Sequence, residues 1–450
     1  MTIWDLFLTP IYLLVLTAIA KRMRDKRYPI GHALRRYYLP GLYVKFFGAI
    51  FIALVFEFYY GGGDTFNYFY HAKVINSALN ESFSTWFQLL FHTPVEKAPN
   101  LYSYAAVMFW YQDPPAYFVS AIAAVFGLLN GTTYIPIALL FAFFSYTGIW
   151  AMYRTFVNIY PALHKHLAIA FLFIPSTFVW GSAVFKDTVC MFGLGWMTYT
   201  TFRIFVNRDI SIKNILMLAF SFFLVATIKL YILLAFIPAL SIWLLLTYSH
   251  KIKSTGTRWL INILFIAITI AGFFYFTEKF AEELNKYSLE KVATTASVTR
   301  EWISYISGDE GSAYDLGEFD PSLQGMISKF PQAVIVTLFR PFLWEVKKPI
   351  VLLSALESLV FLYFTLRLFF SKGTPFKKIF KDPNTLFCFV FSLIFAFAVG
   401  ISSYNFGALS RYKIPCMPFY AAMLMIVLQK DKQRVLSPKA MPVRRPQPIS

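Results

Sequence analysis

Long apolar runs separated by short polar connections recur along the whole chain. A helix needs about 20 apolar residues to cross a bilayer. The runs are continuous, whereas the strands of a membrane barrel alternate between apolar and polar residues, so the pattern predicts helices. We therefore expect an all-α polytopic membrane protein with about 11–13 transmembrane helices. The predicted spans lie at about residues 3–20, 40–60, 115–130, 133–153, 167–183, 188–206, 213–228, 230–248, 258–276, 348–368, 384–402 and 413–429.

Composition and charge support a membrane protein and argue against a nucleic-acid partner. Of the 450 residues, 58% are hydrophobic and 14% are charged, compared with roughly 25% charged residues in soluble domains. The net charge of +18 comes largely from short loops such as KRMRDKR (21–27), HKIKSTGTR (250–258) and QKDKQR (429–434). Positive loops of this kind mark the cytoplasmic side of a membrane protein. We therefore expect an extracytoplasmic N-terminus and lipid as the general partner.

The predicted organisation is one transmembrane domain over residues 1–434, followed by a basic, Pro-rich tail at 435–450 that we expect to be disordered. Loops 65–100 and 277–347 are predicted to be extracytoplasmic and to carry interfacial helices. The count of spans does not close: counting from residue 64 places 154–166 outside, and counting from the C-terminus places it inside. One segment between 101 and 183 is therefore a surface or re-entrant helix, or one predicted span is false. We expect neither a disulfide framework nor a cleavable signal peptide.

The first candidate site residue is Asp64, which follows Gly61-Gly62-Gly63 in FEFYYGGGDTFNYFYHA. Glycines end a helix and allow close approach of the backbone to a ligand. A carboxylate at this place could act as a general base, or it could be an ordinary solvated residue at the interface. Tyr68 could line a binding surface, and its alternative role is in an aromatic belt at the membrane boundary.

Further ionisable residues lie at the ends of other predicted spans. Lys186 and Asp187 separate two apolar runs, and adjacent residues on a helix do not face each other, so we expect them to have different partners. Asp187 could instead be a helix N-cap. Arg340, Arg411 and Lys413 are candidate phosphate ligands, because an extracytoplasmic cation suits a lipid-linked phosphate and the Arg side chain offers a planar fork of donors. Their alternative role is to anchor helix ends at the interface.

Three motifs, in this order, resemble those of the GT-C superfamily of glycosyltransferases, which includes protein O-mannosyltransferases and aminoarabinose transferases. They are GGGDTFNYFYHA (61–72), PSTFVWGSAVFKD (175–187) and SRYKIPCMPF (410–419). The resemblance covers residues 40–425 and implies a GT-C-like bundle, a polyprenyl-phosphate-linked sugar donor and transfer with inversion.

In this resemblance Asp64 is the base that activates an acceptor hydroxyl, and Asp187 is a second acidic group. Lys186, Arg340 and Arg411 neutralise the departing phosphate. The chain departs from the superfamily in its additional leading span. Unlike the oligosaccharyltransferase catalytic subunit, another member, it is expected to have no soluble C-terminal domain. The first loop has no Asp-x-Asp motif, which leaves a requirement for a divalent metal open. The resemblance implies a bacterial inner-membrane enzyme whose site faces the periplasm.

Other functions remain open from the sequence. A carrier or flippase for lipid-linked sugars would be expected to contain an inverted repeat and broken helices, and the sequence has no clear repeat. An O-antigen polymerase or ligase would use Arg and His in a large outer loop, but residues 277–330 contain one Arg, Arg300, and no His. A non-catalytic assembly subunit would have no common site. The sequence identifies neither the sugar nor the acceptor.

Overall fold

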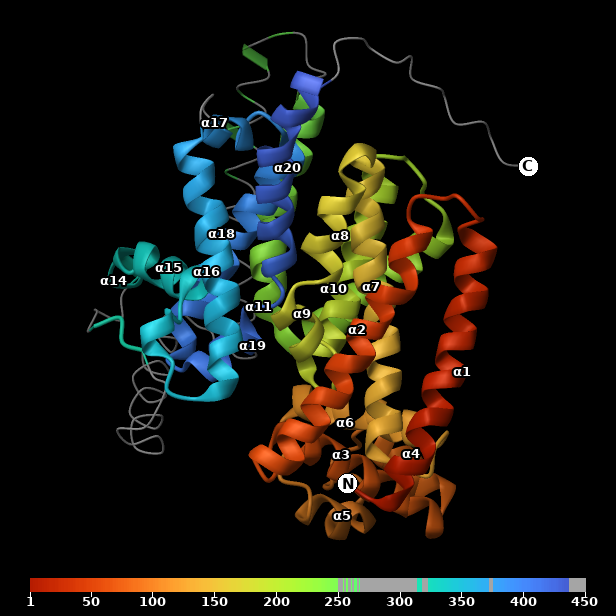
Figure 1. Ribbon diagram of the computed structural model, residues 1–450. Coiled ribbons are helices and arrows are strands. Elements are labelled where there is room, and N and C mark those ends of the chain that lie inside the picture. The colour runs from red at the N-terminus through yellow and green to blue at the C-terminus, as the bar shows by residue number, and fades with distance from the viewer. Residues whose placement is uncertain are drawn as a thin grey trace.

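The computed structural model describes residues 1–249, 314–317, 323–371 and 375–436, with a few positions between 254 and 267. The described part is helical and contains no β-strand, which confirms the all-α prediction (Figure 1). Its α-helices are α1 (Ile3–Arg27), α2 (Arg35–Leu54), α3 (Asp64–Ser77), α4 (Phe83–Leu90), α5 (Tyr102–Ala106), α6 (Pro114–Gly127), α7 (Tyr134–Ile159), α8 (His164–Leu172), α9 (Pro175–Trp180), α10 (Lys186–Phe205), α11 (Ile212–Ser249), α14 (Leu323–Ser328), α15 (Phe330–Phe339), α16 (Pro349–Phe370), α17 (Pro375–Ile379), α18 (Pro383–Ser403), α19 (Phe406–Tyr412) and α20 (Met417–Leu436).

Fewer helices than predicted have the length and composition of a membrane span. Among the described residues there are six: α1, α2 with its continuation to Tyr59, α7, α11, α16 and α18. The pair α19 and α20, bent by 68°, would make a seventh. Two of the predicted spans are too short in the structure: α6 has only 14 residues, and the expected span 167–183 is divided between the short helices α8 and α9. Most of the predicted span 258–276 lies outside the described residues.

Helix α11 is a hairpin rather than one straight rod. Its backbone leaves the helical region at Lys229, where φ is −146° and ψ is 76°. The Tyr248 hydroxyl near its end donates a hydrogen bond to the carbonyl of Phe205, only a few residues before α11 begins. A straight helix of this length would separate its ends by more than 50 Å, at about 1.5 Å per residue. The two arms therefore correspond to the separately predicted spans 213–228 and 230–248, and Lys229 lies at the tip.

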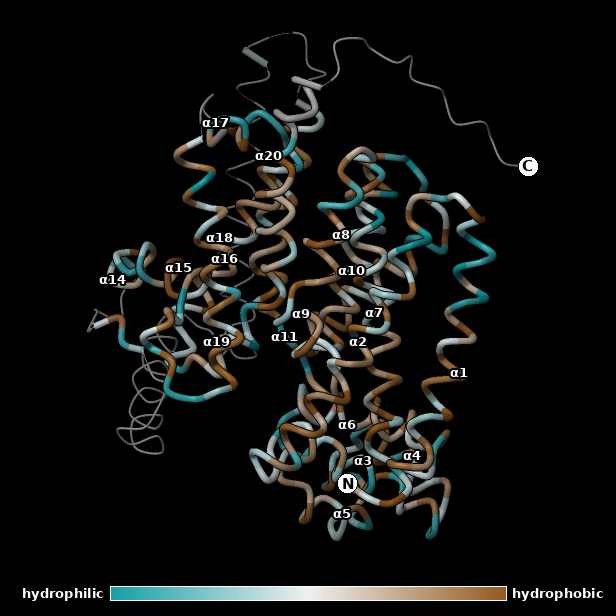
Figure 2. The backbone as a smooth tube through the Cα atoms, viewed as in Figure 1, coloured by the Kyte–Doolittle hydropathy of each residue, from teal (hydrophilic) through white to brown (hydrophobic). Residues whose placement is uncertain are grey.

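The connections after α1, α7 and α17, the first and last of them rich in basic residues, gather at one end of the bundle, here called the basic end. Three hydrogen bonds join its connections: Trp150 Nε1 to the Tyr28 hydroxyl (2.8 Å), the Tyr160 hydroxyl to Asp382 (2.6 Å), and the contact between Tyr37 and His164 (3.3 Å). Figure 2 shows hydrophilic residues concentrated at this end. The opposite end, here called the α3 end, contains the N-terminus and helices α3 to α6 (Figure 1).

This arrangement identifies the segment that disturbed the count of spans. Helix α6 is too short to cross a bilayer core of about 30 Å, and it lies at the α3 end with α3 to α5 (Figure 1). Helix α7 then leads to the basic end, where the Tyr153 hydroxyl contacts the carbonyl of His164. Residues 154–166 therefore lie at the basic end, opposite Asp64 of α3.

Helix α4 has the pattern of an interfacial helix. The Ser82 side chain caps it by accepting a hydrogen bond from Thr85 N at 3.0 Å. Trp86 is buried against the rest of the protein, whereas Phe83 and Phe87 are exposed. The helix contains no charged residue. Exposed aromatic rings on an uncharged helix suit the boundary between lipid and water, as predicted for loop 65–100.

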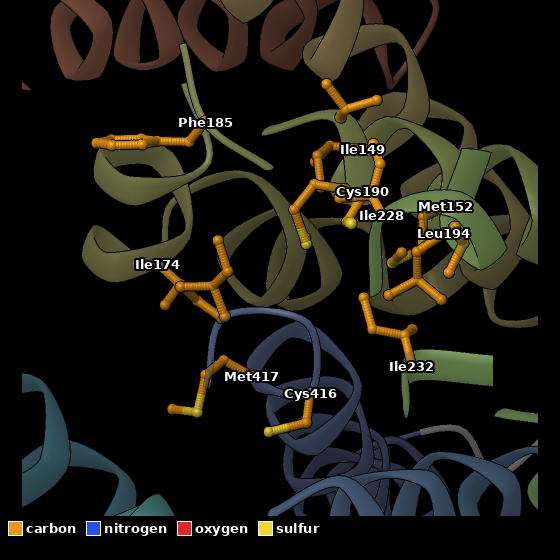
Figure 3. Packing of buried hydrophobic residues seen from close by; sticks show 14 of the residues in the cluster. Ile149, Met152, Ile174, Phe185, Cys190, Leu194, Ile228, Ile232, Cys416 and Met417 are labelled. Carbon is orange, nitrogen blue, oxygen red and sulfur yellow. The ribbon is translucent and has the colours of Figure 1, made fainter. Parts of the chain in front are cut away.

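Close packing of α7 and α10 fixes the direction of α10. A Cβ atom on Gly195 would overlap the backbone of Gly148, so the two helices approach at a contact that only glycine permits. Figure 3 shows Ile149 of α7 and Leu194 of α10 packed with Ile228 near the tip of α11. This core holds the start of α10 beside Lys229.

Candidate active site

The chain turns sharply before Asp64. A π-helical turn, Val55–Tyr59, extends α2, and Gly61, Gly62 and Gly63 then adopt φ values of 66°, 144° and 124°. L-residues rarely adopt such values. A Cβ atom on Gly61 or Gly62 would meet nothing within 4 Å, so backbone conformation rather than crowding requires glycine there. The turn makes Asp64 the first residue of α3, where the positive end of the helix dipole stabilises a carboxylate.

Asp187 has a similar place at the start of α10 but is completely buried, with 0% of its side chain exposed. Its Oδ1 atom accepts a hydrogen bond from Lys229 Nζ at 2.5 Å. Its Oδ2 atom accepts one from Arg411 Nε at 2.7 Å. A buried charge is costly unless it is paired and hydrogen-bonded, and both oxygens of this carboxylate have a cationic partner.

Arg411, in the last turn of α19, joins the two carboxylates. Besides its Nε bond to Asp187, its Nη1 atom donates to Asp64 Oδ2 at 2.7 Å. Its guanidinium carbon lies 4.1 Å from the centre of the Phe185 ring. One residue from each of the three motifs and Lys229 of α11 therefore form one array, Lys229–Asp187–Arg411–Asp64, with two positive and two negative charges. We call it the Arg411 cluster.

The Arg411 cluster runs from the protein interior to its surface. The exposed fraction of the side chain is 0% for Asp187, 7% for Lys229, 11% for Arg411 and 44% for Asp64. Asp64 is thus the member that a molecule from outside the protein reaches first.

Lys186 borders this cluster and has its own partner. Its Nζ atom lies 3.1 Å from Asp113 Oδ2, and Asp113 also caps the start of α6. Lys186 and Asp187 therefore have different partners, as their adjacent positions predicted. Lys186 is the residue before Asp187 in the first turn of α10, which places its charge at the border of the Arg411 cluster.

One face of α3 continues the site inward. Tyr68 and His71 follow Asp64 by four and seven residues, which places all three on the same side of the helix. Tyr68 packs on Trp110, with ring centres 4.8 Å apart, and burial raises the pKa of its phenol. Burial also lowers the pKa of His71 to about 4. His71 Nδ1 is buried and has no hydrogen-bond partner among the described residues.

The structure places the other two predicted cations outside the Arg411 cluster. Arg340 pairs with Glu345, and its Nε lies 3.0 Å from both carboxylate oxygens. Lys413 is completely buried and donates to Ser358 Oγ at 3.0 Å. It therefore does not share an exposed mouth with Arg411, although only one residue separates them.

The short helix α9 has a charged side chain at each end. Glu357 of α16 accepts hydrogen bonds from Ser176 N and Oγ, both at 2.7 Å. At the other end Lys45 of α2 donates to the carbonyl of Gly181. A carboxylate at the N-terminus and an ammonium at the C-terminus match the helix dipole. These contacts hold the connection that leads to Asp187 and give the deep carboxylate of Glu357 a partner.

Lys229 and Asp113 were not predicted as site residues. Lys229 is the only charged residue between Lys213 and Lys251, and an isolated charge in an apolar run is a signal of function.

Among the described residues, no group of three or more His, Cys, Asp or Glu side chains is placed to hold a metal ion. Comparison of the chain with protein-family models, curated proteins and solved structures finds no match.

Proposed function

We propose that this protein is a membrane glycosyltransferase that moves a sugar from a polyprenyl-phosphate-linked donor to an acceptor hydroxyl. The observation that supports it best is the pair of contacts from Arg411 to Asp64 and Asp187. Each of these residues belongs to one of the three motifs that resemble GT-C glycosyltransferases. A potential base and a phosphate-binding cation thus lie side by side, at the surface-exposed end of an otherwise buried array.

The reaction would use this arrangement as follows. Asp64 takes the proton of the acceptor hydroxyl. The acceptor oxygen attacks the anomeric carbon from the side opposite the phosphate, and a new carbon–oxygen bond forms with inversion. The bond between that carbon and the phosphate oxygen breaks, and its electrons leave with the polyprenyl phosphate. Arg411, with Lys186 nearby, stabilises the charge that develops on the phosphate.

The remaining charged residues have supporting roles in this proposal. Asp187, held by Lys229, fixes the guanidinium of Arg411 through its Nε atom. Arg340 and Lys413 have other partners and are given no direct contact with phosphate. The basic end would be cytoplasmic by the positive-inside rule. The site would then face the outside of the cell membrane, which in a bacterium is the periplasmic side of the inner membrane.

Asp64→Asn tests the proposal, because it keeps the shape of the side chain and removes the proton acceptor. General-base assistance contributes about 10²–10⁴-fold to a rate, so turnover of lipid-linked sugar should fall by that order at matched protein levels. Glu81→Gln is the control. Glu81 is also an exposed carboxylate at the α3 end, but it accepts a hydrogen bond from the Tyr104 hydroxyl and has no contact with Arg411. Full activity in Asp64→Asn would remove the base assignment.

A carrier for lipid-linked sugars is the second candidate, and the bend of 68° between α19, which carries Arg411, and α20 favours it. Carriers bind their substrates at broken helices. Proteoliposomes separate the two functions: a transferase forms a glycosylated acceptor, whereas a carrier moves intact lipid-linked sugar across the bilayer. Translocation without a transfer product would favour the carrier.

A further inference from the structure

We propose that the Nη1 edge of Arg411 is the subsite for the donor phosphate and that the Asp64 carboxylate occupies it in the free protein. This inference rests on the proposed function, because it gives a role to the same two residues. It adds that the base is held by an internal ion pair until the phosphate arrives. Asp64 would then be both the occupant of the subsite and the group released from it.

The two carboxylate partners of Arg411 differ in how firmly they are held. Asp187 is 0% exposed and has Lys229 as a second cation at 2.5 Å. Asp64 is 44% exposed, and within the described part of the chain its ion pair is with Arg411. Water compensates an exposed carboxylate that loses its partner, whereas a buried carboxylate would be left as an uncompensated charge. An incoming anion should therefore displace Asp64 and leave Asp187 in place.

A phosphate group suits the position that Asp64 would vacate. The Nε atom of Arg411 is committed to Asp187, and its Nη1 atom lies at the exposed side. The guanidinium fork binds phosphate oxygens as it binds a carboxylate. Lys186, which is paired with Asp113, adds a second cationic side chain at the start of α10, next to Asp187. The subsite therefore matches an anionic phosphate of a lipid-linked sugar at the α3 end.

Charge balance links the binding of the donor phosphate to the release of Asp64 from Arg411. The Arg411 cluster holds two positive and two negative charges, so a phosphate that joined it without displacing Asp64 would leave an excess of negative charge. Exchange of Asp64 for phosphate keeps the balance and leaves the Asp64 carboxylate free to accept a proton. The donor would therefore bind before the acceptor hydroxyl is activated.

The experiment measures binding to the purified full-length protein in lipid nanodiscs, with farnesyl phosphate as the probe. Asp64→Asn removes the competing charge, and we expect it to bind farnesyl phosphate about five- to tenfold more tightly than the wild type, because a partly exposed charged hydrogen bond no longer has to be broken. Asp64→Ala, which also removes the hydrogen-bond acceptor, should show at least as large an increase in affinity for farnesyl phosphate. Glu81→Gln should leave the affinity unchanged.

Two further probes show what the subsite recognises. Farnesol carries no charge, and its affinity should be equal in all these variants; an equal gain with farnesol would overturn the proposal. A gain with inorganic phosphate as well as farnesyl phosphate would assign the subsite to the phosphate group alone. A gain with farnesyl phosphate only would assign it to the lipid-linked form. Unchanged or weaker binding of farnesyl phosphate by Asp64→Asn would also overturn the proposal.

The binding experiment and the transfer assay can fail independently of each other. If Asp64→Asn abolishes sugar transfer without tightening phosphate binding, the transferase stands and the internal competition fails. If Asp64→Asn tightens phosphate binding but the wild type shows no transfer, the subsite stands and the transferase fails.

Discussion

Lys229 and Asp187 form a buried ion pair at 2.5 Å, at the point where the α11 hairpin turns and α10 begins. The pair joins two elements that are adjacent in the chain but whose contacting residues lie 42 positions apart. It also stabilises the charged form of the buried Asp187 carboxylate, which accepts a hydrogen bond from Arg411. The tip of α11 is therefore part of the site, because the turn of the hairpin places Lys229 beside Asp187.

The first prediction concerns this pair. Lys229→Met should reduce the free energy of unfolding by about 3–5 kcal/mol, because one oxygen of a buried carboxylate loses its partner. Asp187→Asn should also destabilise, and the double variant should lose less than the sum of the two changes. Unfolding of the purified protein in detergent measures all three. Additive losses would mean that the two side chains are not coupled.

Asp25→Asn is the control for this cycle. Asp25 pairs with Arg24 and Arg35 at the basic end, and 42% of its side chain is exposed. Exposed ion pairs contribute about 0–1 kcal/mol, so the loss should be small.

The second prediction concerns orientation. Asn100 at the α3 end and Ser211 between α10 and α11 are both exposed, and the three native cysteines are buried. In intact cells, Asn100→Cys should react with a membrane-impermeant thiol reagent, whereas Ser211→Cys should react only after permeabilisation. This follows from the positive charge of the basic end. The reverse pattern would place the proposed site in the cytoplasm.

The sequence allowed much of the site to be predicted because its residues occur in local patterns. Asp64 behind three glycines and Lys186-Asp187 between two apolar runs are both visible without a fold. Their convergence on Arg411 is a tertiary property, and only the order of the motifs suggested it. Lys229 gave a signal as an isolated charge, but its partner depends on the fold of the α11 hairpin.

One predicted span is too short in the structure, and one predicted phosphate ligand lies away from the Arg411 cluster. Hydropathy alone made residues 115–130 look like a span, whereas Asp113 caps α6 at its start and the helix ends at Gly127, which leaves 14 residues. Lys413 lies two residues after Arg411, and side chains two apart near a helix end point in different directions. Arg411 therefore faces the cluster that reaches the surface at Asp64, whereas Lys413 faces Ser358 in the interior.

The third prediction is an acid sensitivity caused by His71. Burial lowers its pKa from 6.5 to about 4 in the folded protein. As the pH falls from about 6.5 towards 4, the unfolded chain takes up a proton that the folded protein excludes, which costs up to about 3 kcal/mol of stability. His71→Phe should remove this component while packing on Trp110. Melting temperatures at pH 7 and pH 4.5 measure it, and an equal loss in the variant would assign the sensitivity to other groups.

The last prediction separates charge from geometry at Arg411. Arg411 reaches Asp187 through Nε and Asp64 through Nη1. Arg411→Lys keeps the positive charge but has one nitrogen, which cannot replace a planar fork of donors. The variant should stay folded, because a cation still accompanies Asp187, but it should bind farnesyl phosphate about tenfold or more weakly. Arg340→Lys is the matched control, since Arg340 pairs with Glu345 outside the cluster, and its affinity should be unchanged. A loss in Arg340→Lys with none in Arg411→Lys would move the phosphate contact to Arg340 and reduce Arg411 to a structural link between two carboxylates.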